Sequence, residues 1–140
     1  MRLRELEAWF SKFEPTAPTA EERALNPQWP PDHLMECYAR VETLAEADGI
    51  WFLCPKCFAA NGGPVGTHSV SVGFTGRCPP GSYGQNLEGQ DVRWQVAAGT
   101  SLDDLSLTPS IQLLSENPTP AFCAWHGFVG SSGVPPGCAA

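Results

Sequence analysis

The sequence predicts an α+β protein of one domain with a small, mainly antiparallel β core. Its 140 residues suffice for one hydrophobic core and are too few for two independent ones. Glycine and proline, 14 residues of each, leave little room for long helices. Several short apolar runs are separated by turn residues, which is typical of short strands joined by loops.

The first residues have the pattern of an amphipathic helix. We predict a helix over residues 1–14, ended by Pro15, whose apolar stripe packs on the domain or on a partner. Its polar face holds too few lysines and arginines for a helix that lies on a membrane. The apolar side chains that recur at helical spacing, with charged residues between them, are Leu3, Leu6, Trp9, Phe10 and Phe13.

Residues 15–33 have the composition of a proline-rich linker or arm. The stretch holds five prolines and allows at most one turn of helix, at residues 20–25. Trp29 lies among these prolines and is the expected anchor, because a large aromatic side chain gains most by filling a pocket. Trp9, Phe13 and Trp29 are therefore the candidate partner-binding residues.

Residues 34–130 carry the strand pattern of the predicted core. The run IWFL at 50–53 is typical of a buried strand, and other runs alternate apolar with small polar residues. Residues 102–105 are expected to form a short helical turn, with two aspartates near its N-terminus. Residues 131–140 are expected to be a flexible tail. The predicted strands are 37–41, 50–53, 68–74, 92–96, 109–114 and 122–129.

Two pairs of residues have the spacing of zinc ligands. Cys54 and Cys57 directly follow a predicted strand, and Cys123 and His126 lie in the last one. Two intervening residues let both side chains of a pair converge on one ion, and tetrahedral Zn²⁺ accepts thiolate and imidazole ligands. We therefore predict one structural zinc that ties the first strand of the core to the last. His68 is a candidate additional ligand, a hydrogen-bond donor to a thiolate, or an ordinary polar residue at a strand end.

Three alternatives to the zinc site remain open, namely a redox centre, disulfides, and unrelated buried cysteines with a core histidine. A thioredoxin-like centre needs a helix that starts at the Cys-Pro-x-Cys motif, and the glycine-rich stretch 58–64 is not expected to supply one. The even count of six cysteines suits disulfides, yet residues 1–12 contain no apolar run typical of a signal peptide. Cys37, Cys78 and Cys138 lack a partner at ligand spacing and are expected to be inert thiols.

The charge and the lack of long apolar stretches disfavour two classes of partner, nucleic acid and membrane. The formal net charge is −7, and the eight lysines and arginines are scattered, which disfavours direct binding of nucleic acid. No stretch approaches the 18 apolar residues of a membrane span, so no membrane partner is expected.

Four segments resemble an uncharacterised family of small phage and bacterial proteins that share a Cys-Pro-x-Cys knuckle and a later Cys-x-x-His element. They are WFLCPKCF at 51–58, GTHSVSV at 66–72, residues 92–111 and CAWHGF at 123–128. The resemblance implies a phage or prophage origin. With such an origin, we expect the protein in the cytoplasm of a bacterial host or in a virion. It also implies zinc ligation by Cys54, Cys57, Cys123 and His126, with His68 as an addition.

These observations predict a non-enzymatic, zinc-stabilised interaction or structural protein. The helix and the arm would contact a protein partner or a second copy of the chain. A catalytic zinc keeps an open water position and a nearby carboxylate, which a closed set of three cysteines and one histidine does not offer. The alternatives are a virion component, such as a capsid or tail accessory protein, a zinc-dependent hydrolase, and an acidic inhibitor of a host defence system.

Overall fold

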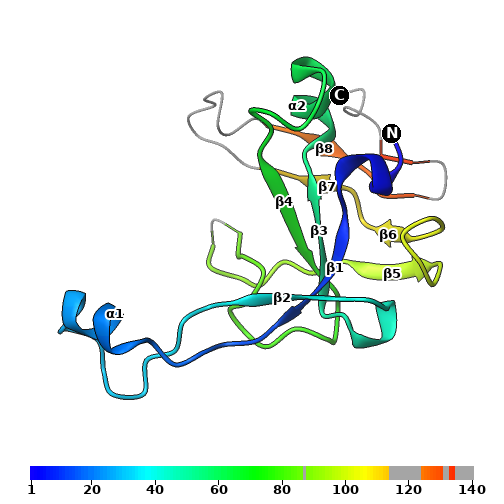
Figure 1. The fold of residues 1–140 in the computed structure, drawn as a ribbon. Helices are drawn as coiled ribbons and strands as arrows, with labels where there is room; N and C mark the ends of the chain where they lie inside the picture. The colour runs from blue at the N-terminus through cyan, green and yellow to red at the C-terminus, as the bar shows by residue number, and fades with distance from the viewer. Residues whose placement is uncertain (87, 114–123, 131–132, 135–140) are drawn as a thin grey trace.

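A four-stranded sheet forms the centre of the molecule in the computed structural model, which describes residues 1–86, 88–113, 124–130 and 133–134 (Figure 1). The strand order is β2-β1-β3-β4, and all three neighbouring pairs are antiparallel. Two small sheets pair β5 with β6 and β7 with β8. The mainly antiparallel β fold is thus confirmed. The elements in chain order are η1 (Leu3–Leu6), β1 (Trp9–Phe13), α1 (Ala20–Leu25), β2 (Tyr38–Val41), η2 (Leu44–Glu46), β3 (Gly49–Leu53), α2 (Pro55–Asn61), β4 (Ser69–Gly73), β5 (Gln95–Ala98), β6 (Ser106–Thr108), β7 (Ile111–Gln112) and β8 (His126–Gly127).

One face of the central sheet is the hydrophobic core. β3 lies between β1 and β4, and its Ile50 and Phe52 are fully buried opposite Val72 and Val70 of β4. Burying an aliphatic or aromatic side chain of this size contributes about 1.5–3 kcal/mol. Trp125 closes the core from the described segment 124–130, where its ring meets Phe52 edge to face at 6.0 Å.

A loop residue, Tyr83, covers part of the other face of the sheet. Its phenol oxygen lies 2.8 Å from the hydroxyl of the buried Ser11, and its backbone N–H donates to the Tyr38 hydroxyl at 3.0 Å. The ring packs directly on Gly49 and Gly73, where a Cβ would lie 2.4 and 2.8 Å from atoms of Tyr83. The two glycines therefore let the loop approach the sheet closely.

The prediction of a helix over residues 1–14 is wrong. The segment is one 3-10 turn, η1, followed by strand β1. Glu7 takes a left-handed conformation with φ 55° and ends the turn. Leu3 and Leu6 occupy buried positions in the turn, whereas Trp9 and Phe10 lie on opposite sides of a strand. Tertiary pairing with β2 and β3 overrides the helical spacing, because β1 fills the gap between them.

The proline-rich arm is the extension of the β1–β2 ribbon. The register of these strands continues through a pair of hydrogen bonds between Thr16 and Met35, at 3.0 and 2.7 Å. The tip carries α1, as expected for residues 20–25, with Thr19 as its N-cap. Trp29 stacks on His33 of the same arm, with ring centroids 4.2 Å apart. Figure 1 shows the tip projecting away from the sheets.

Most of the remaining predictions hold in part. The strands predicted at 37–41, 50–53 and 68–74 are β2, β3 and β4, and the helical turn at 102–105 is a hydrogen-bonded turn. The strand predicted at 92–96 begins later, as β5, because Trp94 only bridges to Phe74. β7 and β8 are shorter than predicted, β6 was not predicted, and residues 135–140 of the tail lie outside the described residues. No helix in the described part of the chain is long and apolar enough to cross a membrane.

Replacing Gly49 with alanine should destabilise the fold by about 3 kcal/mol, because the new methyl group would overlap the Val72 carbonyl oxygen and the Tyr83 ring. Gly130→Ala is the matched control, since a Cβ there meets nothing within 4 Å and should change stability by less than about 0.5 kcal/mol. Urea denaturation of both variants checks the prediction. Equal midpoints would contradict the close packing of Tyr83.

Alkaline pH should weaken the fold through Tyr83. Burial raises the pKa of this phenol above its ordinary value of 10, and the hydrogen bond with Ser11 only partly offsets the effect. The neutral phenol therefore stabilises the folded state fully below about pH 10, and this contribution is lost as the unfolded chain ionises at higher pH. The free energy of unfolding of the wild type should fall more steeply between about pH 10 and 12 than that of Tyr83→Phe. Parallel profiles would contradict the prediction.

Candidate metal centre

Strand register places His68 beside Cys54. β3 and β4 pair from Gly49 opposite Gly73 to Leu53 opposite Ser69. One step further along the same ladder, the Cys54 N–H donates to the His68 carbonyl oxygen at 2.9 Å. Two residues that are 14 positions apart are thereby held opposite each other at the end of the sheet.

Helix α2 starts at the cysteine motif, contrary to the expectation for residues 58–64. Cys54 is its N-cap, and Pro55 occupies the first helical position, where its missing N–H costs nothing. Gly62, with φ 68°, ends the helix, and its N–H donates to the Ala59 carbonyl. Glycine thus terminates the helix at its C-cap instead of preventing it. Cys57 follows Cys54 by three residues and returns to the same side of the first turn.

The register and the helix together form a Cys-Cys-His group. One ligand atom each from Cys54, Cys57 and His68 lies within 4.8 Å of the other two. Ligands bound about 2.0–2.3 Å from a tetrahedral ion lie roughly 3.3–3.8 Å apart, so small side-chain rotations would close this group on one metal. Cys54 is fully buried, whereas the other two side chains are partly exposed. These three residues could hold a metal ion.

The hydrogen bonding of His68 suits a ligand. Its Nδ1 lies 3.1 Å from the Ser69 carbonyl oxygen, which can only accept, so Nδ1 carries the proton. The lone pair is then on Nε2, and the backbone fixes both tautomer and ring orientation. A ring nitrogen bound to a carbonyl is the usual outer-shell support of a metal-binding histidine.

The second predicted pair is not brought into this group within the described residues. Cys123 lies outside them. His126 is exposed on β8, and its Nε2 is 2.8 Å from the Ser110 hydroxyl. The chain just after Cys123 does lie near the motif, because Lys56 donates to the Ala124 carbonyl oxygen at 3.4 Å. The roles of Cys123 and His126 as ligands remain predictions.

The structure bears on the alternative of a redox centre. A helix does start at the Cys-Pro-x-Cys motif. The expectation that no helix starts there, which was the sequence argument against a redox centre, is therefore wrong. Exchange chemistry requires an accessible thiolate, and Cys54 is 0% exposed. No disulfide joins two cysteines in the described part of the chain. Burial of Cys54 and the presence of His68 beside it favour a metal ligand.

The remaining described cysteines have structural environments. Cys78 donates to the Asp48 and Phe74 carbonyl oxygens at 3.0 and 3.3 Å. Burial raises the pKa of its thiol, which keeps the thiol protonated and a poor nucleophile. Cys37 lies 3.3 Å from the Thr16 hydroxyl in the arm, and Cys138 is outside the described residues.

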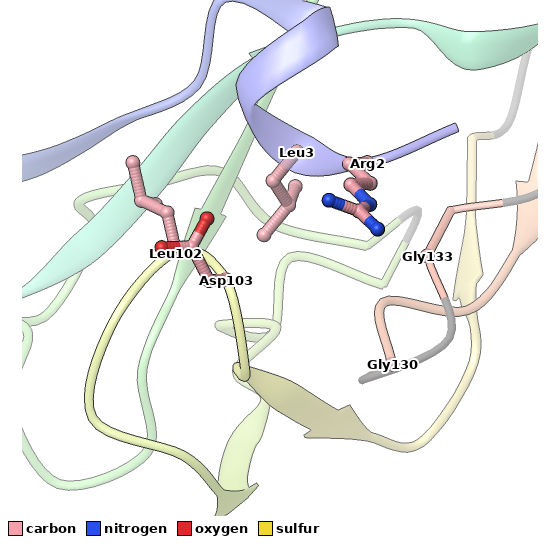
Figure 2. A pocket seen from close by; sticks show the side chains of 6 residues that line it. All are labelled: Arg2, Leu3, Leu102, Asp103, Gly130 and Gly133. Carbon is pink, nitrogen blue, oxygen red and sulfur yellow. The ribbon is translucent and has the colours of Figure 1, made fainter.

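Surface hollows occur away from the Cys-Cys-His group. One, of about 210 Å³, lies between η1 and the turn at residues 102–103, and Figure 2 shows Arg2 and Leu3 facing Leu102 and Asp103 across it. Arg4 beside Asp103, at 2.6 Å, lowers the pKa of that carboxyl. The contact ties η1 to the turn, which suggests a structural role for this region.

No protein-family model, no curated protein and no solved structure matches the chain.

Removing the His68 side chain should weaken metal binding. We expect His68→Ala to raise the dissociation constant for Zn²⁺ or Co²⁺ by about a hundredfold or more, because one of the grouped ligands is lost. Competition titration against a chelator measures the change. His33→Ala is the matched control, since His33 stacks on Trp29 in the arm. Unchanged affinity in His68→Ala, with loss in His126→Ala, would contradict the assignment.

Proposed function

We propose that the protein is a non-enzymatic, zinc-stabilised module that presents the arm to a protein partner. The Cys54, Cys57 and His68 group carries the proposal. Two thiolates and an imidazole are ligands that tetrahedral Zn²⁺ prefers, whereas Mg²⁺ and Ca²⁺ prefer oxygen. Its place at the joined ends of β3, α2 and β4 is where an ion would hold three elements together.

Cys123 is the fourth ligand in this proposal. The support is indirect: the sequence places Cys123 immediately before Ala124, whose carbonyl oxygen accepts from Lys56 inside the Cys-Pro-Lys-Cys turn. The next residue, Trp125, packs on Phe52 near the end of β3. A cysteine at this point would complete a closed thiolate-rich set. His126 remains the alternative fourth ligand, through its Nδ1, because Nε2 faces Ser110.

The energetic consequence of such a site is large. Structural zinc contributes roughly 10–16 kcal/mol of apparent binding free energy in small domains, and a whole domain is stable by only about 5–15 kcal/mol. The described helices α1 and α2 have six and seven residues, and three of the eight strands have three residues or fewer. Elements this short depend on tertiary links, so an ion at the end of the sheet would decide whether the fold persists.

A zinc-dependent hydrolase is the second candidate. It is favoured by the number of grouped residues, because catalytic zinc commonly has three protein ligands and one water. Against it stand the complete burial of Cys54 and the composition of the group, which includes no carboxylate to act as a base. The non-enzymatic role is therefore the better supported.

The origin proposed for the chain is a phage or prophage, from the resemblance of its cysteine and histidine segments to phage and bacterial proteins. It would act in the host cytoplasm or in the virion. A virion accessory role and inhibition of a host defence system would both use protein contacts of the acidic surface. The net charge of −7 supports a protein partner over nucleic acid.

Loss of zinc should unfold the domain. We expect purified protein to contain about one zinc per chain, and Cys57→Ser or chelation to lower the melting temperature by more than 15 °C or abolish the transition. Elemental analysis and thermal melts measure both effects. Cys78→Ser is the matched control, because its thiol lies outside the Cys-Cys-His group and donates to backbone carbonyls, which a hydroxyl can also do.

The same samples separate the structural from the catalytic site. Cys123→Ser should lose zinc and stability as Cys57→Ser does if the fourth ligand is a thiolate. Retention of full zinc affinity by Cys123→Ser and by His126→Ala would favour a bound water and hence the hydrolase. Wild-type protein that folds with well under one metal ion per chain would overturn the proposal.

A further inference from the structure

Two stacked tryptophans mark an open part of the sheet surface. Trp9 of β1 lies directly opposite Trp51 of β3, so both side chains leave the same face of the sheet. Their ring centroids are 5.3 Å apart with an interplanar angle of 22°. Both side chains are only partly buried. The ladder continues to Ser11 and Gly49 on this face, where Tyr83 covers it.

Two arginines flank the tryptophans. Arg4, Trp9 and Arg40 together line two adjoining hollows of about 530 and 340 Å³; the first also includes Trp51 and Glu7, and the second includes Glu42. Arg4 is already paired with Asp103, whereas exposed Arg40 makes no ion pair with a carboxylate of the described residues. Tryptophan and arginine are the side chains most enriched at the centres of protein interfaces. We call Arg4, Trp9, Arg40 and Trp51 the tryptophan–arginine face.

The arm has the opposite chemistry. Residues 15–33 hold three acidic residues and one arginine, a net charge of −2. That arginine, Arg23, donates to the carbonyl oxygens of Pro30 and Pro31 and so is used inside the arm. Leu25 and Leu34 are 82% and 51% exposed. A preformed arm of prolines, exposed leucines and carboxylates suits a surface of indole rings and guanidinium groups.

The arm cannot reach the tryptophan–arginine face of its own chain. β1 runs from Trp9 at one end to Phe13 at the other, and the ribbon continues past Phe13 in the same direction through the Thr16–Met35 pair. The tip with α1 therefore points away from the four-stranded sheet, as Figure 1 shows. Only another molecule can place such an arm on this face.

We propose that the tryptophan–arginine face receives the acidic arm of a second copy of this chain, so that two copies exchange arms. Each copy contributes one arm and one face, which gives a closed twofold dimer. The proposal rests on the proposed function, which takes the arm as the element that contacts a protein partner. It identifies that partner as a second copy of the chain. Charge complementarity between the acidic arm and Arg40, which forms no ion pair among the described residues, selects the orientation.

Charge reversal tests the exchange. Sedimentation velocity over a concentration series should show a dimer for the wild type, weakened as salt rises. Arg40→Glu, and separately the double variant Glu21→Lys with Asp32→Lys, should each raise the dimer dissociation constant by about tenfold or more. Mixed in equal amounts, the two variants should form a heterodimer. In it, the arm with reversed charge meets the face with reversed charge, and the wild-type arm meets the wild-type face. Lys12→Glu is the matched control, an exposed charge on the opposite face of β1.

The outcomes are distinct from those of the zinc proposal. Circular dichroism and zinc content, measured on every variant, report on fold and metal independently of association. A wild type that stays monomeric at all concentrations overturns the exchange, even where its zinc content is one per chain. A dimer that Arg40→Glu leaves intact, or variants that fail to restore each other, overturn it as well. Dimerisation restored only in the mixture supports it.

Discussion

The antiparallel register between β3 and β4 is the constraint on which the rest of the molecule depends. It sets Ile50 and Phe52 against Val72 and Val70 in the core. It ends at the hydrogen bond from the Cys54 N–H to the His68 carbonyl oxygen. A slip of one residue would turn the apolar side chains to the opposite face and separate the cysteine from the histidine. Core packing and the candidate metal centre are thus two results of one ladder.

The sheet has two faces with different uses. One is buried by apolar side chains, including Trp125. The other is divided: Tyr83 seals the part over Gly49 and Gly73, while Trp9 and Trp51 lie in the part with open hollows. This division explains why large aromatic residues remain half exposed on a sheet that otherwise hides its apolar groups. A surface of this kind usually marks an interface.

The proposed zinc site and the proposed arm exchange depend on different sources of rigidity. An ion at Cys54, Cys57 and His68 would hold short elements in place where little helix is available. The arm, by contrast, is kept in shape by its own contacts, namely the Thr19 cap and the stacking of Trp29 on His33. A rigid base and a preformed arm reduce the conformational entropy that binding would cost.

The sequence by itself determined the fold class, three of the four central strands, the short helix of the arm, and the Cys54 and Cys57 pair, because short-range patterns and ligand spacing are local properties. Tertiary structure alone decided that residues 9–13 are a strand, since helical spacing cannot show the gap between β2 and β3 that they fill. It also decided that Gly62 ends a helix at the motif. It brought His68 into the candidate metal centre because strand register, a long-range property, sets which residue faces Cys54.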